Sequence, residues 1–492
     1  MRRTLRHVPA RSGAGLIALG AALVASLGAT ACGNFDITNP NSPSVDDLIR
    51  DPSRSRLAAA ATGLFAGARG DAQGLIWILG SMGREGAKLD GNNQPDYQEP
   101  FYGPMSPGGV GGAFWAGRFA TIRSANVYLQ ALDEATALSD GEIAASRGMA
   151  KAMKALAMLQ VIITRGALGA PVDVDRPLTD TAKAPFVSQD SVYGYIVNQL
   201  DSAYAELTAA GGAAFPFDVP PGFQGNVGGL DLSTPSAFRE YVRALKAKAL
   251  VLRGSLGCGD PCFTAALAAL GESFLDPNGD LRAGAYFDFS TRSGDVVNRL
   301  SDPLGGTTFF ALNDVLSAEA QQQPGGAPDQ RLLDKLVAAT DTQRLSGFPV
   351  VGDTKFSIYL GPGGAADPSA SIPIIRNEEL LLLRAEAEIG VGDRSAALAD
   401  LNLIRSRSGQ LGPAALTAGS STDDFITELL YNRRFSLLWE QGTSWIDARR
   451  YNRLDTLPVI VDGGAVPTIF PVPSQECASR GLPVPCSPLG GG

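Results

Sequence analysis

The sequence predicts a mainly α-helical protein with long, ordered loops between its helices. Three observations support this fold class. Apolar residues recur every three or four positions in several long segments, as in helices with one buried side. Glycine and proline are frequent, with 58 and 32 of 492 residues, so ordered loops must connect the helices. Hydrophobic residues make up 45% of the chain, which is enough for a substantial core.

The predicted helices fall into two blocks. Those of the first block are expected near 44, at about 53–68, 72–82, 115–136, 142–165, 188–207 and 236–254. The second block begins at 377–409, where two helices flank a glycine-rich turn. This pair has the size of a tetratricopeptide unit, so we expect tetratricopeptide-like helix pairs. A long helix over 422–440 and a short one over 444–451 follow.

Two stretches lack regular periodicity and are predicted to be loop-rich. Residues 83–114 contain many glycines and prolines together with several aromatic residues. Residues 255–372 read as a long irregular insertion with short helices and room for a small hairpin. The expected organisation is one domain over 32–492, with a helical scaffold at about 44–254 and 373–452.

The first 31 residues have the composition of a secretory signal. Four arginines precede an uncharged run of small and apolar residues, which ends in Ala29-Thr30-Ala31-Cys32. A cysteine at the cleavage point resembles a bacterial lipobox, with Ala29 in the place usually held by leucine. Cleavage would leave Cys32 first and ready for acylation, and two or more acyl chains hold a protein stably on a membrane. The alternative is an uncleaved membrane helix.

Removal of this signal leaves an acidic chain without histidine. His7 is the single histidine, so the remaining chain cannot use a Ser-His-Asp triad, a Cys-His dyad or His-ligated zinc. The 41 basic residues become 37 without the four arginines of the signal, against 50 acidic residues, which gives a net charge of −13. Such a chain repels phosphate backbones, so nucleic acid is not an expected partner.

The four remaining cysteines are expected to form two local disulfides. Cys258 and Cys262 flank a Gly-Asp-Pro turn, and Cys477 and Cys486 flank a proline-bearing loop. An even number of cysteines in an oxidising compartment favours disulfides. A zinc cluster is the alternative, but these spacings without histidine suit zinc poorly. We therefore expect no metal.

The C-terminal third carries several recognisable motifs. In 377–409, a leucine-rich helix with an Arg-Ala-Glu sequence precedes Leu-Asn-x-Ile-Arg. The segment 427–451 contains Asn-Arg-Arg, Glu-x-Gly and Trp-x-Asp-x-Arg, and Phe-Pro-Val-Pro follows at 470–473. These motifs resemble the SusD/RagB family, with Asn432 where glutamate is usual. The resemblance spans most of the chain after Cys32, is strongest after 372 and is loose over 255–372.

The resemblance implies an all-α fold in which tetratricopeptide-like helix pairs form a scaffold that supports an irregular, loop-rich binding face. It also implies a function. SusD/RagB proteins are outer-membrane lipoproteins of the cell surface that lie over a SusC-like TonB-dependent barrel. They capture a glycan, or in some members a peptide, for nutrient uptake. The resemblance therefore implies carbohydrate binding, no cofactor and no enzymatic activity.

Capture of a sugar requires flat aromatic faces and polar groups, best carried on loops over a rigid scaffold. Both loop-rich stretches supply such residues, and those from 83–114 form the favoured site. The candidate ligand-binding residues are Arg84, Asp90, Asn92, Asn93, Tyr97, Tyr102, Tyr286, Phe309, Phe310 and Asn313. The alternative is that the aromatic residues simply pack the loops down.

Other charged residues suit structural roles better. The C-terminal motifs contain a cluster of charged and aromatic residues that we expect to lock helices together. These residues are Glu440, Trp445, Asp447, Arg449 and Arg450. Glu379 and Glu386 share a helix face, but glycoside hydrolysis needs two carboxyls across a cleft, which a packed helix rarely offers. Two other functions stay open. A bare concave helical surface would favour an envelope scaffold, and a cleft with two facing acids and a raised pKa would favour a hydrolase.

Overall fold

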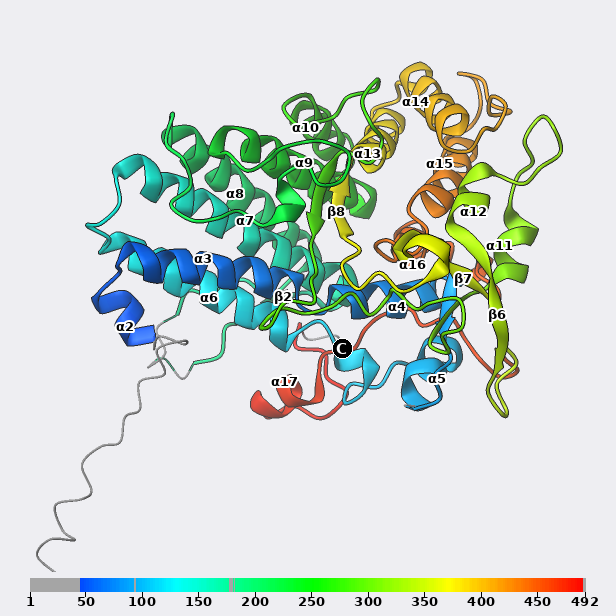
Figure 1. Cartoon of the computed structure of the whole chain (residues 1–492), viewed down its shortest axis with the longest axis horizontal. Coiled ribbons are helices and arrows are strands. Elements are labelled where there is room, and N and C mark those ends of the chain that lie inside the picture. Colours follow the sequence, from blue (N-terminus) through cyan, green and yellow to red (C-terminus); the bar gives the residue numbers. More distant parts are fainter. Residues whose placement is uncertain (1–44, 93, 177–179, 181, 490–492) are drawn as a thin grey trace, which may run out of the picture. The chain divides into compact units, whose positions relative to one another are not determined.

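The computed structural model describes residues 45–92, 94–176, 180 and 182–489. The chain divides into two units, Met1–Asp47 and Leu48–Gly492, and nearly all described residues belong to the second. The predicted signal and Cys32 lie outside the described residues. The predicted fold class is confirmed, because the described part is mainly helical and its strands are short and paired in two-stranded sheets (Figure 1).

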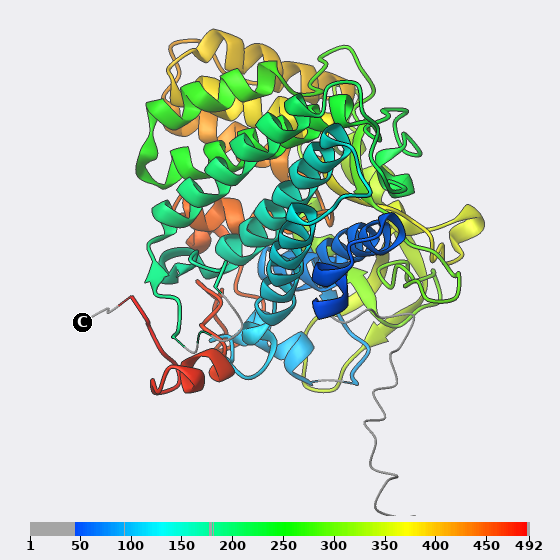
Figure 2. The ribbon, with the colours of Figure 1, turned by 90° about the vertical axis from the view of Figure 1, so that its left-hand side faces the viewer.

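The first block of helices forms one side of the second unit. Its elements are α2 (Val45–Arg50), α3 (Arg54–Arg69), α4 (Ala72–Met82), α6 (Ala116–Asp133), α7 (Asp140–Arg165), α8 (Gln189–Ala209) and α9 (Pro235–Arg253). Helix α7 is buried along most of its length and packs against both α6 and α8. It starts in a capping box, in which Ser139 and Glu142 satisfy each other's backbone N–H groups. Figure 2 shows these helices side by side.

The second block contains the predicted helix pair and the two helices after it. Its elements are α13 (Asn377–Gly390), α14 (Arg394–Arg407), α15 (Thr422–Ser436), α16 (Thr443–Arg450) and the short α17 (Ser474–Ser479). Asp393 accepts the N–H of Ala396 at the start of α14. The prediction placed the end of helix α15 at Glu440, but the helix ends at Ser436. It ends there because Leu437 leaves the helical conformation and Trp439 takes a φ of 59°. That left-handed turn directs the Trp439 indole into the core.

The stretches predicted to be loop-rich contain more regular structure than expected. The first includes β1 (Gly86–Lys88), α5 (Gln94–Tyr102) and a 3-10 turn, η1 (Val110–Gly112). The second begins with a twelve-residue helix that was not predicted, α10 (Asp260–Gly271). Pro261 suits the first turn of this helix, but the π-turn η4 (Gly254–Cys258) interrupts the apolar period before it.

The rest of the second stretch combines short helices with paired strands. Its elements are β4 (Gly284–Phe287), β5 (Phe309–Ala311), α11 (Asn313–Glu319), α12 (Gln330–Lys335), β6 (Leu336–Arg344), β7 (Val351–Phe356), η5 (Ser357–Tyr359), η6 (Pro362–Gly364) and β8 (Ile372–Arg376). Strands β6 and β7 form the hairpin, while β1 pairs with β5 and β4 with β8, all antiparallel. The β1–β5 pair joins the two loop-rich stretches. Smaller elements elsewhere are β2 (Ala170–Pro171), β3 (Phe186–Val187), η2 (Gly166–Leu168), η3 (Pro221–Phe223) and η7 (Leu454–Thr456).

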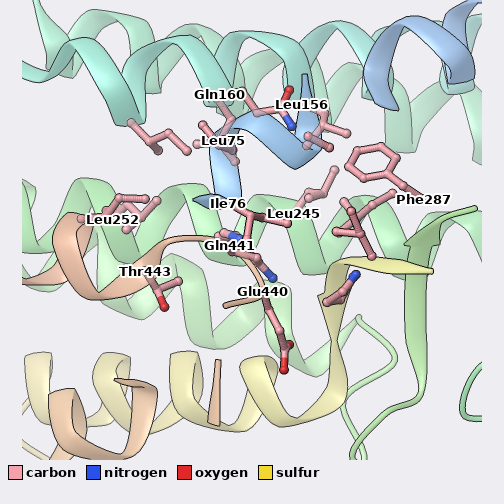
Figure 3. A pocket seen from close by; sticks show the side chains of 18 of the residues that line it. Leu75, Ile76, Leu156, Gln160, Leu245, Leu252, Phe287, Glu440, Gln441 and Thr443 are labelled. Atoms are coloured by element: carbon pink, nitrogen blue, oxygen red, sulfur yellow. Dashed lines mark hydrogen bonds between the residues drawn. The ribbon is translucent and has the colours of Figure 1, made fainter. Parts of the chain in front are cut away.

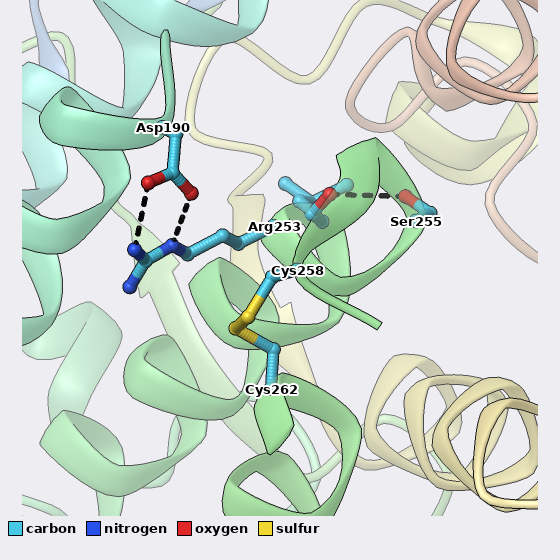
Figure 4. Close-up of a disulfide and its surroundings, with 6 residues drawn as sticks. Asp190, Arg253, Ser255, Cys258 and Cys262 are labelled. Carbon is cyan, nitrogen blue, oxygen red and sulfur yellow. Dashed lines mark hydrogen bonds and ion pairs between the residues drawn. A yellow bond between two sulfur atoms is a disulfide. The ribbon is translucent and has the colours of Figure 1, made fainter. Parts of the chain in front are cut away.

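Both expected cysteine pairs are joined in the structure. Cys258 is bonded to Cys262 and Cys477 to Cys486. The first disulfide closes the turn between α9 and α10, next to the ion pair of Arg253 with Asp190 (Figure 4). Among the described residues, none of the helices combines the length and the apolar character needed to span a bilayer.

Candidate functional site

The charged residues of the C-terminal motifs form buried ion pairs between helices. Arg450 of α16 donates from Nη2 to Oε2 of Glu386 in α13 at 2.7 Å. Asp447 accepts from Arg433 of α15 at 2.6 Å and from Arg450 at 2.9 Å. The side chains of all four are at most 4% exposed. Buried charges of both signs in such close contact tie α13, α15 and α16 together, which is a structural role.

The glutamates that could have suggested a hydrolase are packed in the same interior. Glu379 is fully buried, with Lys248 Nζ at 2.9 Å and the Gln441 amide at 2.8 Å. Glu386 is held by Arg450 and by the hydroxyl of Tyr451. Neither carboxyl group faces a cleft, so this pair does not have the geometry that glycoside hydrolysis requires.

Four of the candidate ligand-binding residues lie inside the protein, namely Arg84, Phe309, Phe310 and, at a different place, Tyr286, which is 5% exposed. Arg84 has no exposed surface and donates to the carbonyl oxygens of Pro458 at 2.8 Å and Pro100 at 2.9 Å. Burial lowers the pKa of its guanidinium to about 10. Phe309 and Phe310 of β5 are 6% and 0% exposed. The side chains of Arg84, Phe309 and Phe310 therefore lie beneath the candidate binding surface and offer almost no surface to a ligand.

The β1–β5 pairing brings most of the candidate residues together. Ala87 lies opposite Phe310 and Lys88 opposite Phe309, so the first loop-rich stretch adjoins the segment that ends in Asn313. Asn313 begins α11, where its Oδ1 accepts the hydroxyl of Ser317. Asn93 lies outside the described residues. Tyr286 belongs to a different place, described below.

Above the buried layer lies a surface that we call the loop face. It consists of Trp77, Lys88, Asp90, Asn92, Tyr97 and Tyr102. The ammonium group of Lys88 lies 5.3 Å from the ring centroid of Trp77 and pairs with Asp96 and, at 3.4 Å, with Asp90. The backbone N–H of Asn92 donates to Asp90, and the Asn92 side chain is exposed. Trp77, Lys88 and Asp90 are therefore in contact, and Asn92 adjoins them through Asp90.

The two tyrosines of the loop face rest on the hairpin between β6 and β7. Their ring centroids lie 5.3 Å (Tyr97) and 6.5 Å (Tyr102) from that of Phe348, and both rings are half-buried. Sequence reasoning missed Trp77 and Lys88. Trp77 lies in α4, a helix predicted to belong to the scaffold, and only the position of β1 against that helix places Lys88 over its ring. No signal in the sequence connects them.

Tyr286 lines a second site, a cleft of about 920 Å³ that we call the polar cleft. Residues 278–282, α12, residues 358–371 and the end of α14 surround it. Its floor is an ion-pair network in which Arg376 donates to Glu440 at 2.8 Å and also pairs with Glu378, while Lys335 donates to Glu440 at 2.7 Å.

The two glutamates of this floor are ionised. Burial by itself would raise the pKa of Glu378, but Arg376, Lys335 and the Ser408 hydroxyl hold it at about 2. The pKa of Glu440 is lowered in the same way, since Arg376 and Lys335 outweigh its burial. The floor of the cleft thus contains two acidic side chains, but neither has the raised pKa that a general acid needs.

A third hollow is a small internal cavity of about 60 Å³ between α4, α7, α9 and the segment 440–446 (Figure 3). Most of its lining is aliphatic, but Gln160 and Thr443 also face it. It is too small for a sugar. Within the described residues, no group of three or more His, Cys, Asp or Glu side chains could hold a metal ion.

Helix pairs that carry a loop-rich face, with the C-terminal motifs buried as ion pairs between them, form a SusD-like fold. Residues 354–468 match the model of the SusD family. Over this segment the chain is similar to that family. No curated protein matches its sequence.

Solved structures of SusD superfamily proteins share the fold across nearly their whole length. A SusD superfamily protein from Bacteroides vulgatus has a TM-score of 0.64 at 14% identity, covering 87% of this chain and 97% of its own. NanU of B. fragilis has a TM-score of 0.59 at 16% identity, with coverages of 89% and 97%. A laminarin-binding SusD-like protein has a TM-score of 0.59 at 16% identity, with coverages of 87% and 98%. At these identities the likeness concerns the fold.

Proposed function

We propose that this chain is an outer-membrane lipoprotein of the cell surface, anchored through Cys32, that binds a glycan at its loop face. It passes the glycan to a SusC-like TonB-dependent transporter for uptake. The match of residues 354–468 to the SusD family model supports this role, and one protein of the same fold binds laminarin, a glycan. The signal-like first 31 residues support the anchor.

The observation that carries the binding role is the gathering of groups on the loop face. Trp77, Tyr97 and Tyr102 provide aromatic surface for the apolar side of a pyranose ring. Asp90 and the exposed amide of Asn92 stand beside them as partners for sugar hydroxyls. The β1–β5 pair and the buried Arg84 fix this surface on a rigid base, which reduces the entropy lost on binding.

Binding without hydrolysis fits the Glu379 and Glu386 pair and the two glutamates on the floor of the polar cleft. Glu379 and Glu386 are committed to interior partners, and Glu378 and Glu440 are ionised at neutral pH. A glycosidase would need one protonated carboxyl group next to the scissile bond.

The binding role can be tested with tryptophan fluorescence. Trp115, Trp439 and Trp445 are buried, so Trp77 is the one partly exposed tryptophan of the described residues. We would titrate the protein with laminarihexaose, maltohexaose and xylohexaose. At least one should change the emission, and Trp77→Phe should abolish the change. Tyr97→Ala should weaken binding about 5- to 10-fold, as expected for loss of one aromatic contact.

A matched control is Asn198→Ala, which removes an exposed side chain on α8, away from the loop face, and should leave the titration unchanged. If none of the saccharides bound, the glycan role would be wrong. Binding that Tyr97→Ala and Trp77→Phe left intact would move the site away from the loop face.

The transport role needs a separate experiment on the full chain in its native membranes. Purification without crosslinker should recover a large TonB-dependent barrel with the protein. Cys32→Ser should release the protein from the membrane fraction. Recovery of other envelope-assembly proteins and no barrel would instead support a scaffold.

A further inference from the structure

We propose that the polar cleft is a second saccharide-binding site, separate from the loop face, that takes a short neutral oligosaccharide. This inference rests on the proposed function, because it takes the ligand class from it. The cleft volume of about 920 Å³ lies within the range of small-ligand sites and leaves room for several sugar rings.

The charge of the cleft favours a neutral ligand. Five basic and five acidic residues line it, so their formal charges cancel. The basic residues are Arg282, Arg331, Lys335, Arg376 and Arg407, and the acidic ones are Asp280, Asp334, Asp367, Glu378 and Glu440. The deepest charges are already paired with one another. A charged ligand would find no unpaired counter-charge on the floor, whereas hydroxyl groups can bond to ionised side chains of both signs.

Two unpaired amides stand on the wall of the cleft. The side chains of Asn278 and Gln410 are exposed, and neither makes a hydrogen bond with any residue that the structure describes. Each amide offers two donors and an acceptor, which suits vicinal hydroxyls. Arg407 donates to the carbonyl oxygens of Pro277 at 2.6 Å and Gly279 at 2.8 Å, and so holds the turn that carries Asn278.

The cleft also has apolar surface for a sugar face. Tyr286 forms part of its wall, and its hydroxyl donates to the carbonyl oxygen of Arg282. Ile358, Leu360 and Pro373 line it as well. Because Tyr286 is only 5% exposed, it offers little of its ring to a ligand, and the half-buried Ile358 and Leu360 supply most of the apolar contact.

A row of packed rings separates the cleft from the loop face. The ring centroid of Trp77 lies 6.4 Å from that of Phe309, which lies 6.3 Å from that of Trp439. Glu440, the next residue, belongs to the cleft floor. Ligands at the two sites would therefore not touch each other, and only a ligand at the loop face would contact Trp77.

The test counts the sites with laminaritriose and maltotriose as probes on the purified full chain. Isothermal titration calorimetry counts all bound molecules, while Trp77 fluorescence reports the loop face alone. We expect one of the probes to bind at two molecules per chain. The double variant Asn278→Ala/Gln410→Ala should lose the second site, with at least a 10-fold weaker affinity there, and keep the fluorescence titration. Asn198→Ala should bind as the wild type does.

The outcomes separate the two proposals. Calorimetric binding that the Asn278→Ala/Gln410→Ala variant weakens, with no fluorescence change for either probe, would support the cleft and reject the loop face. One molecule per chain, with binding lost in Tyr97→Ala and unchanged in the double variant, would overturn the cleft and keep the loop face. Displacement of the probe from the cleft by trigalacturonate at lower concentration than by the neutral probes would overturn the neutral ligand class.

Discussion

Trp439 stacks on Phe356, with ring centroids 4.2 Å apart and planes 7° from parallel. The Trp439 backbone N–H donates to Glu85 Oε2 at 2.9 Å, and its carbonyl oxygen accepts the hydroxyl of Tyr359 at 3.0 Å. This one residue therefore connects the residue before β1, the end of β7 and the turn η5. Trp439 therefore belongs to the base of the loop face and also adjoins the floor of the polar cleft.

The close packing around this stack makes Gly86 sensitive to substitution. A Cβ atom there would lie 2.7 Å from the Trp439 ring, 2.8 Å from the Phe356 ring and 2.7 Å from the Phe310 carbonyl oxygen. We expect Gly86→Ala to lower the free energy of unfolding by about 1–3 kcal/mol, as overpacking does, and to weaken saccharide binding at the loop face. Urea denaturation and fluorescence titration measure the two effects.

Gly63 in α3 provides the matched control, because a Cβ atom there meets nothing within 4 Å. Gly63→Ala should raise the free energy of unfolding by about 0.5–1 kcal/mol through helix propensity. Equal effects of the two substitutions would contradict the packing described for Gly86.

We expect strong energetic coupling between the substitutions of Arg450 and Glu386, which form a buried ion pair. Arg450→Met leaves the Glu386 carboxylate with a weaker counter-charge in the interior and should cost about 3–5 kcal/mol of unfolding free energy. Arg450→Met/Glu386→Leu removes both charges and should cost clearly less than the sum of the single variants. Urea denaturation of all three variants gives the coupling energy.

The exposed pair of Arg253 and Asp190 is the comparison. Arg253→Met should cost less than about 1 kcal/mol, because solvent screens this pair. Simple additivity at Arg450 and Glu386 would show that their contact does not couple α13 to α16.

Because of Glu388, we expect the free energy of unfolding to fall as pH rises. Burial raises its pKa to about 8, the neighbouring Asp400 adds to the shift, and Arg384 opposes it. Arg384 is committed to Asp400, with Nε to Oδ2 at 2.6 Å, and lies 3.8 Å from Glu388. Between pH 4.5 and 8 the folded state holds a proton that the unfolded state has lost, so stability decreases with pH through this window.

Glu388→Gln removes this dependence. The variant should match the wild type below about pH 4 and become progressively more stable than it up to pH 8–9, as measured by urea denaturation. Glu142 has the opposite sign, since hydrogen bonds from Arg54 and Ser139 lower its pKa to about 2. Glu142→Gln should therefore lose stability above pH 4.5 and match the wild type below about pH 2. A pH-independent difference for Glu388→Gln would show that this carboxyl group is ionised in the folded state.

We expect the small internal cavity between α4, α7 and α9 to hold bound water. Oε1 of Gln160 and Oγ1 of Thr443 are buried and have no hydrogen-bond partner among the described residues. With about 60 Å³, the cavity has room for about two waters at 30 Å³ each, and its polar groups favour hydration. A crystal structure at high resolution should show ordered water within hydrogen-bond distance of both atoms. Empty density there would mean that the aliphatic lining keeps the cavity dry.

Local patterns in the sequence determined the helices and the resemblance to the SusD family. The leucine-rich 377–409 pair and the long helix α7 follow from apolar periodicity, which acts within one helix and needs no knowledge of its neighbours. The same reasoning missed α10, where a π-turn breaks the period, and placed the end of α15 too late, because the packing of the Trp439 ring decides that end.

Only the tertiary structure decided what the candidate site residues do. Arg84 and Phe310 resemble Tyr97 and Tyr102 in sequence context, yet the first two are buried beneath the surface that the other two help to form. The difference arises from the pairing of β1 with β5, two short strands more than 200 residues apart in the chain. The same pairing sets Lys88 over Trp77, and the separate strand pair of β4 and β8 sets Tyr286 in the polar cleft. Contacts between such distant segments leave no periodic trace in the sequence, because they depend on how whole elements pack.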